Sequence, residues 1–252
     1  MLKNGEHLEP LGNDIEVIVS DVHHFYTDTI LLAHFANPKK RAKCVDLGSG
    51  CGTIPLLWAR TDKELSVTAV EIQEDAADMI SRSVAHNGLE NCITPLCADL
   101  KDLKGKLPFG YFDLVVCNPP YKITGGGIKN TNLNRVTVRH ENACTMEDVV
   151  ATASKLLQFS GNFCMCQRPE RLTDAMILFR KYDLEPKELR LVQGKADKKP
   201  KLFLLKGKKG GKEGFLDVLP TLIIENDDQS FTDEMNSIYG CYRENAGRQK
   251  ND

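Results

Sequence analysis

The residues most able to do chemistry lie in a glycine-rich segment, VDLGSGCGT (45–53), where a β-branched run gives way to a helical pattern. Gly48, Gly50 and Gly52 allow a sharp turn and let the backbone approach a ligand that a Cβ atom would push away. The spacing is G-x-G-x-G, whereas dinucleotide-binding turns carry G-x-G-x-x-G. Asp46, just before the turn, would repel a pyrophosphate. The segment therefore favours a cationic or zwitterionic ligand.

Two further acids follow the next two predicted strands. Glu71 closes SVTAVEI (66–72), 19 residues beyond Gly52, where an α/β fold places a carboxylate that accepts both hydroxyls of a ribose. Asp99 closes NCITPLCAD (91–99) and is placed to accept from an adenine amino group. A glycine turn alone also suits another cofactor or a purely structural role. Together with three acids at three strand ends, it predicts a pocket for a positively charged nucleoside.

A second cluster, Asn118-Pro119-Pro120-Tyr121, directly follows the apolar run FDLVVC (112–117). Ligands of open parallel sheets bind beyond such strand ends. The prolines restrict the backbone, so the Pro119 carbonyl points outward beside the acceptor of Asn118. Two acceptors hold both hydrogens of a planar amino group and direct its lone pair at an incoming methyl group, while Tyr121 offers a stacking surface worth about 1–3 kcal/mol per base. Taken alone, the segment also suits a turn that merely ends a strand.

The strings VDLGSGCGTIPL (45–56), VEI (70–72) and AD (98–99) resemble the motifs of class I S-adenosylmethionine-dependent methyltransferases. The resemblance implies binding of S-adenosyl-L-methionine and release of S-adenosyl-L-homocysteine, without a metal. The cofactor residues that it implies are Asp46, Gly48, Gly50, Cys51, Gly52, Glu71, Ile72, Asp99 and Leu100.

An N-P-P-Y segment at this place is similar to that of the superfamily members that methylate planar amino groups. The resemblance implies that Asn118, Pro119, Pro120 and Tyr121 are the catalytic residues. RNA cytosine-C5 methyltransferases instead need a nucleophilic cysteine just after a proline. Cys117 precedes Asn118, so that chemistry is excluded.

A closer resemblance covers nearly the whole chain. FYTDTILLA (25–33), NPPYK (118–122), RHE (139–141), GNFCMCQRPERL (161–172) and LEPKELRLVQ (184–193) together resemble the bacterial tRNA1(Val) (adenine(37)-N6)-methyltransferase family. This resemblance implies N6-methylation of an adenine beside the anticodon of a valine tRNA. The residues expected to contact the tRNA are Asp28, Lys122, Arg139, Lys198, Lys199, Lys208 and Lys209. The run 125–127 and the tail after Gly240 match nothing in that family, which leaves the contacts of the target loop and the tRNA species open.

The distribution of charge agrees with an RNA partner. The 252 residues carry 33 Lys and Arg against 35 Asp and Glu, a formal charge of −2, which by itself argues against a nucleic-acid binder. Between Arg180 and Lys212, however, twelve basic residues face four acids, a local charge of +8. A single basic face suffices for phosphate contacts. The alternative is a solvated lysine surface that protects strand edges from aggregation.

The elements that must position these residues alternate between strands and helices. Helical patterns at 53–61, 74–88 and 146–158 separate the apolar runs at 42–47, 66–72, 91–99, 112–118 and 162–168, which predicts an α/β, Rossmann-like, doubly wound and mostly parallel sheet. The runs 189–194 and 201–207 have no helix between them and predict an antiparallel edge hairpin. A helix over FYTDTILLA is expected to be capped by Thr27 or Asp28, and a closing helix by Thr232.

The chain is expected to divide into an N-terminal extension that packs on the catalytic domain (1–40), a methyltransferase domain (41–240) and a flexible tail (241–252). No run of 18 apolar residues occurs and the N-terminus is polar, which predicts a cytoplasmic protein without a membrane span. Two alternatives stay open. A protein-glutamine N5-methyltransferase of release factors would use the NPPY segment in the same way. Chains that resemble those enzymes have a separate N-terminal helical substrate-binding domain, and the roughly 40 residues before the glycine turn are too few for one. The other is a non-catalytic RNA-binding protein with the same fold.

Overall fold

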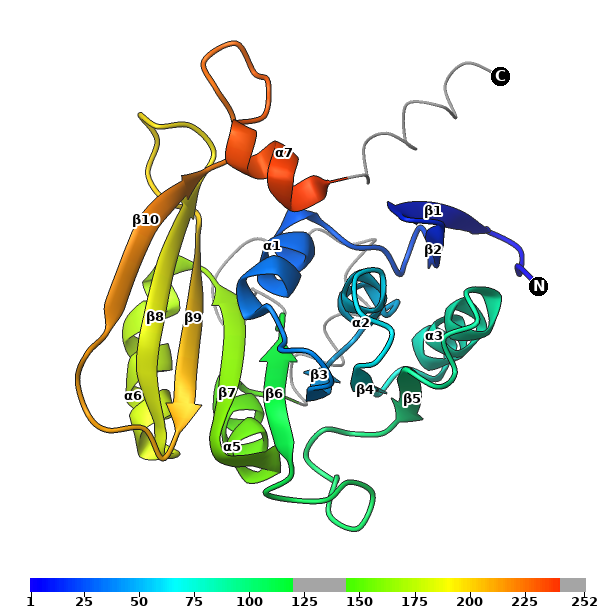
Figure 1. Cartoon of the computed structure of the whole chain (residues 1–252), viewed down its shortest axis with the longest axis horizontal. Coiled ribbons are helices and arrows are strands. Elements are labelled where there is room, and N and C mark those ends of the chain that lie inside the picture. Colours follow the sequence, from blue (N-terminus) through cyan, green and yellow to red (C-terminus); the bar gives the residue numbers. More distant parts are fainter. Residues whose placement is uncertain (120–143, 241–252) are drawn as a thin grey trace, which may run out of the picture.

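The described part of the chain, residues 1–119 and 144–240 of a computed structural model, is built around an eight-stranded sheet with helices on both faces (Figure 1). The strand order is β10-β8-β9-β7-β6-β3-β4-β5. All neighbours are parallel except β7–β9 and β8–β9. The strands are β3 (Lys43–Leu47), β4 (Ser66–Glu71), β5 (Ile93–Cys97), β6 (Phe112–Cys117), β7 (Leu157–Gln167), β8 (Leu184–Gln193), β9 (Leu202–Lys209) and β10 (Asp217–Ile223). The predicted doubly wound fold is confirmed.

Helices cover the two faces because successive strand residues point to opposite sides and are apolar on both. On β3, Cys44 belongs to one buried cluster and Val45 to the other. The first cluster lies under α1 (Thr27–Ala36), α2 (Thr53–Ala59), α3 (Glu74–His86) and α7 (Asp233–Tyr239), and the second under α5 (Met146–Leu156) and α6 (Leu172–Lys181), which follows the short 3-10 turn Pro169–Arg171.

The expected antiparallel hairpin is present as β8 and β9, but it does not form the edge of the sheet. β10 lies outside it and pairs with β8 in parallel, with Val218 opposite Leu189. This strand is not predicted from the sequence, because Pro220, which lacks an N–H group, interrupts the run 217–223. In the structure, Val218 is exposed. Both features are tolerated on an edge strand, where one side of the backbone needs no partner.

The N-terminal residues form a second, two-stranded sheet, β1 (Glu6–Gly12) and β2 (Ile15–Ser20), which the sequence does not predict. Asn13 and Asp14 turn the hairpin with positive φ angles of 52° and 58°. This hairpin lies against α3 (Figure 1): the Ile18 N–H donates to Ser83 Oγ at 3.0 Å. The N-terminal segment is therefore fixed to the helix that follows Glu71.

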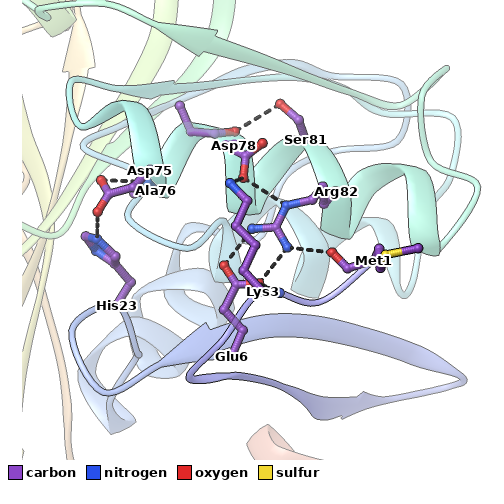
Figure 2. Close-up of polar contacts among 10 residues, drawn as sticks. Met1, Lys3, Glu6, His23, Asp75, Ala76, Asp78, Ser81 and Arg82 are labelled. Atoms are coloured by element: carbon purple, nitrogen blue, oxygen red, sulfur yellow. Dashed lines mark hydrogen bonds and ion pairs between the residues drawn. The ribbon is translucent and has the colours of Figure 1, made fainter.

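An ion cluster joins the same two elements (Figure 2). Arg82 on α3 donates through its two Nη atoms to the two carboxylate oxygens of Glu6, both at 2.6 Å, and through Nε to Asp78 at 2.8 Å. Lys3 Nζ also contacts Asp78 at 2.6 Å. The Arg82 and Glu6 side chains are only 17% and 8% exposed. The hydrogen bond from Arg82 holds the pKa of Glu6 below its ordinary value, and those from Lys3 and Arg82 do the same for the pKa of Asp78.

We expect Arg82→Met to lower the free energy of unfolding by about 1–3 kcal/mol at pH 7, because it leaves the partly buried Glu6 carboxylate without its guanidinium. A carboxylate whose pKa is lowered by folding stabilises the protein above its unfolded pKa and loses that contribution as the pH falls through its folded pKa. The difference between wild type and variant should therefore shrink below about pH 4. Urea denaturation at pH 7 and pH 3.5 measures it. The matched control is Arg41→Met, which breaks only the exposed pair with Glu64; an equal loss in both variants would contradict the prediction.

The helix ends agree with the sequence in one case and differ in another. Thr232 caps α7 by accepting from the Met235 N–H, as predicted. The expected cap of α1 by Thr27 or Asp28 is wrong: Tyr26 occupies the N-cap position without a side-chain cap. Thr27 is the first helical residue, and its hydroxyl forms a hydrogen bond of 3.0 Å with the hydroxyl of Tyr239 on α7.

Within 1–119 and 144–240, no helix combines the length and the apolar character needed to cross a membrane.

Candidate active site

The candidate site lies where β3, β4 and β6 end side by side. In the register of the sheet, Asp46 on β3 is opposite Ala69 on β4 and Val116 on β6. Glu71 and Asn118 each follow two residues further on, so the glycine turn, the second predicted acid and the start of the NPPY segment meet at one edge. The sheet thus brings together groups that lie in three separate sections of the sequence.

The glycine turn has left-handed backbone at all three glycines, with φ of 72° at Gly48, 57° at Gly50 and 86° at Gly52. A Cβ atom at Gly52 would lie 3.1 Å from Ile80 Cγ1 on α3, so this glycine allows close packing of the turn against that helix. A Cβ atom at Gly48 or Gly50 would meet nothing within 4 Å among the described residues. The space beside these two glycines is therefore open to a ligand.

Glu71 ties the glycine turn to the end of β4. Its buried carboxylate accepts from the Gly50 N–H through Oε2 at 2.8 Å and from the Gln73 N–H through Oε1 at 2.9 Å. Each carboxylate oxygen has a second lone pair. The two backbone contacts fix the carboxylate in one orientation before any ligand arrives.

Asp46 is buried, and only one of its oxygens is satisfied. Oδ2 accepts from Ser49 Oγ at 2.6 Å, whereas Oδ1 has no hydrogen-bond partner among the described residues. Burial raises the pKa of Asp46 to about 7, the charge of Glu71 adds to the rise, and the bond from Ser49 opposes it. A buried carboxylate with an unsatisfied oxygen fits a positively charged ligand, because unpaired buried polar atoms are costly.

The raised pKa of Asp46 predicts an unusual pH dependence of stability. The folded protein holds this proton more tightly than the unfolded chain, so the free energy of unfolding should fall as the pH rises from about 4 to 7. We expect Asp46→Asn to remove this fall and to gain roughly 2–4 kcal/mol relative to wild type between pH 5 and pH 8. Urea denaturation without methyl donor at both pH values tests it, with Asp102→Asn, an exposed carboxylate, as the control. A variant-to-wild-type difference that is the same at both pH values would contradict the assignment.

Asn118 begins the second half of the site and touches α1. Its Nδ2 donates to Thr29 Oγ1 at 3.1 Å, and Pro119 beside it is buried. Asp28, expected to contact substrate, is buried in the same first turn of α1, and its Oδ1 accepts from the Thr29 N–H at 2.8 Å. The segment upstream of the glycine turn is thereby brought to the end of β6. Pro120, Tyr121, Lys122 and Arg139 lie outside the described residues.

The remaining predicted cofactor residues are Ile72, Asp99, Leu100 and Cys51. Ile72, next to Glu71, is 40% exposed and offers an apolar surface for a flat ring. Asp99 follows β5 and accepts from the Lys101 N–H at 2.9 Å, and Leu100 comes next. The Cys51 thiol is buried against Thr53 Oγ1 at 3.3 Å, so the contact that Cys51 can make with a ligand is through its backbone.

The twelve basic residues between Arg180 and Lys212, here called the basic strip, are divided between the two ends of the sheet. Lys198 and Lys199 lie in the connection from β8 to β9, at the same end as the arrowheads of β6 and β7 (Figure 1). Lys208 is opposite Glu185, near the start of β8 and thus toward the other end of the sheet, and Lys209 pairs with Asp183 at 3.1 Å. Six of the twelve basic residues of the strip pair with acids in the described part of the chain: Arg180, Lys181, Arg190, Lys198, Lys206 and Lys209.

The sequence does not predict two residues of this site, Ser49 and Thr29. Both have small hydroxyl side chains whose partners are set by the folded chain. Thr29 does belong to the string FYTDTILLA, which is singled out for its resemblance, so its neighbourhood is predictable although its contact is not.

Residues 26–176 match the family model described as the methyltransferase small domain. The chain belongs to this family. The matched region contains the glycine turn, all three acids and Asn118, so the predicted methyltransferase is confirmed at the level of the family. The turn at Gly48 and Gly50, the preset Glu71 carboxylate and the unsatisfied oxygen of Asp46 fit S-adenosyl-L-methionine, the cofactor that membership of this methyltransferase family indicates.

Curated relatives of this methyltransferase small domain protein carry the name tRNA1(Val) (adenine(37)-N6)-methyltransferase. That of Pedobacter heparinus is 31% identical over 137 residues, which cover 54% of this chain and 56% of the relative. That of Porphyromonas gingivalis is 28% identical over 184 residues, 71% of each chain. That of Shewanella woodyi is 26% identical over 215 residues, 83% of this chain and 87% of the relative. The matched share of these relatives' own lengths thus runs from 56% to 87%.

Solved structures show the same fold. A predicted O-methyltransferase from Agrobacterium tumefaciens superposes with a TM-score of 0.70 at 21% identity, covering 86% of this chain and 97% of the other. A geranyl diphosphate methyltransferase in complex with SAM gives a TM-score of 0.52 at 11% identity, covering 72% and 84%. At these identities the likeness speaks for the methyltransferase fold alone.

Proposed function

We propose that this protein transfers the methyl group of S-adenosyl-L-methionine to N6 of an adenine in tRNA, beside the anticodon of a valine tRNA. The observation that carries the proposal is the placement of Asn118 and Pro119 at the end of β6, next to the glycine turn after β3. This placement supports a pair of acceptors for an amino group beside a pocket suited to a cationic nucleoside. The names of the relatives supply the tRNA and the adenine.

The donor would be held by residues with distinct tasks. Glu71 accepts the ribose hydroxyls, Ile72 packs against the adenine ring, and Asp99 accepts from the adenine amino group. Asp46 places negative charge next to the cationic part of the ligand. When bound, S-adenosyl-L-methionine supplies a methyl group already activated by its sulfonium.

The acceptor would be held by Asn118 and Pro119. An adenine N6 amine is a weak nucleophile because its lone pair is delocalised into the ring. Hydrogen bonds from its two N–H groups to Asn118 Oδ1 and to the Pro119 carbonyl turn the lone pair toward the methyl group, and the proton displaced from N6 leaves to solvent. Because the donor is already activated, this alignment supplies most of the acceleration.

A labelled methyl-donor assay that offers total tRNA, ribosomal RNA, DNA and release factors in parallel tests the proposal. We expect label in tRNA, recovered as N6-methyladenosine at position 37 after nuclease digestion and mass spectrometry. Label on release factor alone would overturn the proposal and establish the glutamine alternative. RNA binding without any label would establish the non-catalytic alternative.

Because the lysines of the basic strip lie at both ends of the sheet, we expect those at the end nearer the candidate site to contribute more to RNA affinity. Replacing Lys198 and Lys199 by Gln removes two charges at the site's end of the sheet and should reduce the slope of log affinity against log salt concentration by roughly 1–2. The matched control replaces Lys208 and Lys209, at the far end of β9, by Gln. Fluorescence anisotropy with tRNA from 50 to 200 mM salt measures both. If the first pair leaves the slope unchanged, the β8–β9 connection is not part of the RNA footprint.

A further inference from the structure

The contact between Asn118 and α1 has a direction that bears on chemistry. An asparagine side chain has a donor end and an acceptor end, and a half-turn about its last bond exchanges them. In the site described above, only the oxygen end can accept a hydrogen of a target amino group. The N–H end would meet those hydrogens donor to donor. Which end of Asn118 faces the target therefore decides whether the site is productive.

Thr29 sets this direction through a short chain of hydrogen bonds. Its hydroxyl donates to Asp28 Oδ1 at 3.4 Å and accepts from Asn118 Nδ2 at 3.1 Å. Asp28 Oδ1 also accepts from the Thr29 N–H, which keeps the buried carboxylate against the hydroxyl. Because a hydroxyl has one proton and that proton goes to the carboxylate, Thr29 meets Asn118 as an acceptor. It selects the N–H end of the amide.

We propose that Thr29 is a positioning residue that turns the Asn118 amide so that its oxygen, and not its N–H group, meets the target amine. The proposal rests on the proposed function, because it requires that Asn118 accept from a planar amino group. Asp28 acts one step further back, by fixing the polarity of the Thr29 hydroxyl. The first turn of α1 thereby contributes to the reaction through Asn118.

Thr29→Val tests this at constant helix propensity, since both side chains are β-branched. We expect the single-turnover rate of methyl transfer to fall about five- to tenfold, the effect of losing one neutral hydrogen bond, with the donor Kd unchanged. Thr29→Ser, which keeps the hydroxyl, should restore the rate. The matched control is Thr27→Val in the same turn, which loses a hydroxyl bonded to Tyr239 instead of Asn118, and its rate should stay near that of wild type.

A double-mutant cycle separates orientation from mere support. Asn118→Asp puts two equivalent oxygens at the site, so no direction remains to be chosen. In that background, Thr29→Val should lower the rate much less than it does in the wild type. Additive effects, a wild-type rate in Thr29→Val, or a Thr29→Ser variant as slow as Thr29→Val would each overturn the inference. If the wild type methylates a glutamine amide instead of an adenine of tRNA, the proposed function fails. The same variants measured on that acceptor still decide the role of Thr29.

Discussion

Asn118→Ala is expected to lower the rate of methyl transfer by roughly 100- to 1,000-fold, comparable to the loss of a preorganised hydrogen-bonding group in other active sites. The variant loses the acceptor that orients the target amine, and the Pro119 carbonyl alone holds only one of its two hydrogens. Methyl-donor affinity should change little, because the glycine turn and the acids at the ends of β3 and β4 stay in place. The loss should therefore appear in the rate of the chemical step.

Single-turnover kinetics with tRNA and calorimetric titration of the donor separate these two effects. Asn162→Ala is a suitable control, since it makes the same substitution on β7, the strand next to β6, but level with Leu114 instead of at the end of the strand. We expect that control to retain the wild-type rate. A parallel loss of donor affinity and turnover in Asn118→Ala would contradict the assignment of Asn118 to the target amine.

Glu71→Gln is expected to raise the donor Kd by roughly 100-fold, because charge-assisted hydrogen bonds contribute about 1.5–3 kcal/mol each and an amide has one acceptor where the carboxylate has two. The substitution acts twice. It weakens the bonds to the ribose hydroxyls. It also places an amide N–H group against the backbone N–H of Gly50 or Gln73, both of which donate to the carboxylate in the wild type. The turn that receives the donor therefore loosens as well.

Calorimetric titration with S-adenosyl-L-homocysteine measures the effect without turnover. Glu74→Gln is the matched control: it removes the same charge three residues later, on the exposed side of α3, and should bind normally. A Glu71→Gln variant that binds the donor normally but turns over slowly would show that Glu71 acts in chemistry and not in donor binding.

The parallel core of the fold and the placement of the acids were predictable from the sequence because both depend on local signals. β-branched runs, helical spacing and glycines lie next to one another along the chain, and the end of a parallel strand is where its ligand groups must be. β10 and the β1–β2 hairpin were not predicted. Their strands lie at sheet edges, where exposed and irregular residues such as Val218 and Pro220 are tolerated and the alternating pattern disappears.

The finer structure of the site was not predictable, for a different reason. Thr29 and Asn118 are 89 residues apart, and only the packing of α1 beside β6 brings their side chains together. The sequence likewise indicates a basic strip between Arg180 and Lys212 but not which of its residues lie at which end of the sheet. The chain reverses between β8 and β9, so residues close in sequence, such as Lys199 and Lys208, end up at different ends of the sheet.

The hydrogen bond between Thr27 and Tyr239 affects the order in which the protein folds during synthesis. Its partners are separated by 212 residues, which a ribosome takes about 10–40 s to add. Through that interval the sheet from β3 to β7 can assemble, but α1 lacks its contact with α7. Contacts of such long sequence separation form late and slow folding. The nascent chain is thus expected to form its methyl-donor pocket before α7 packs on α1.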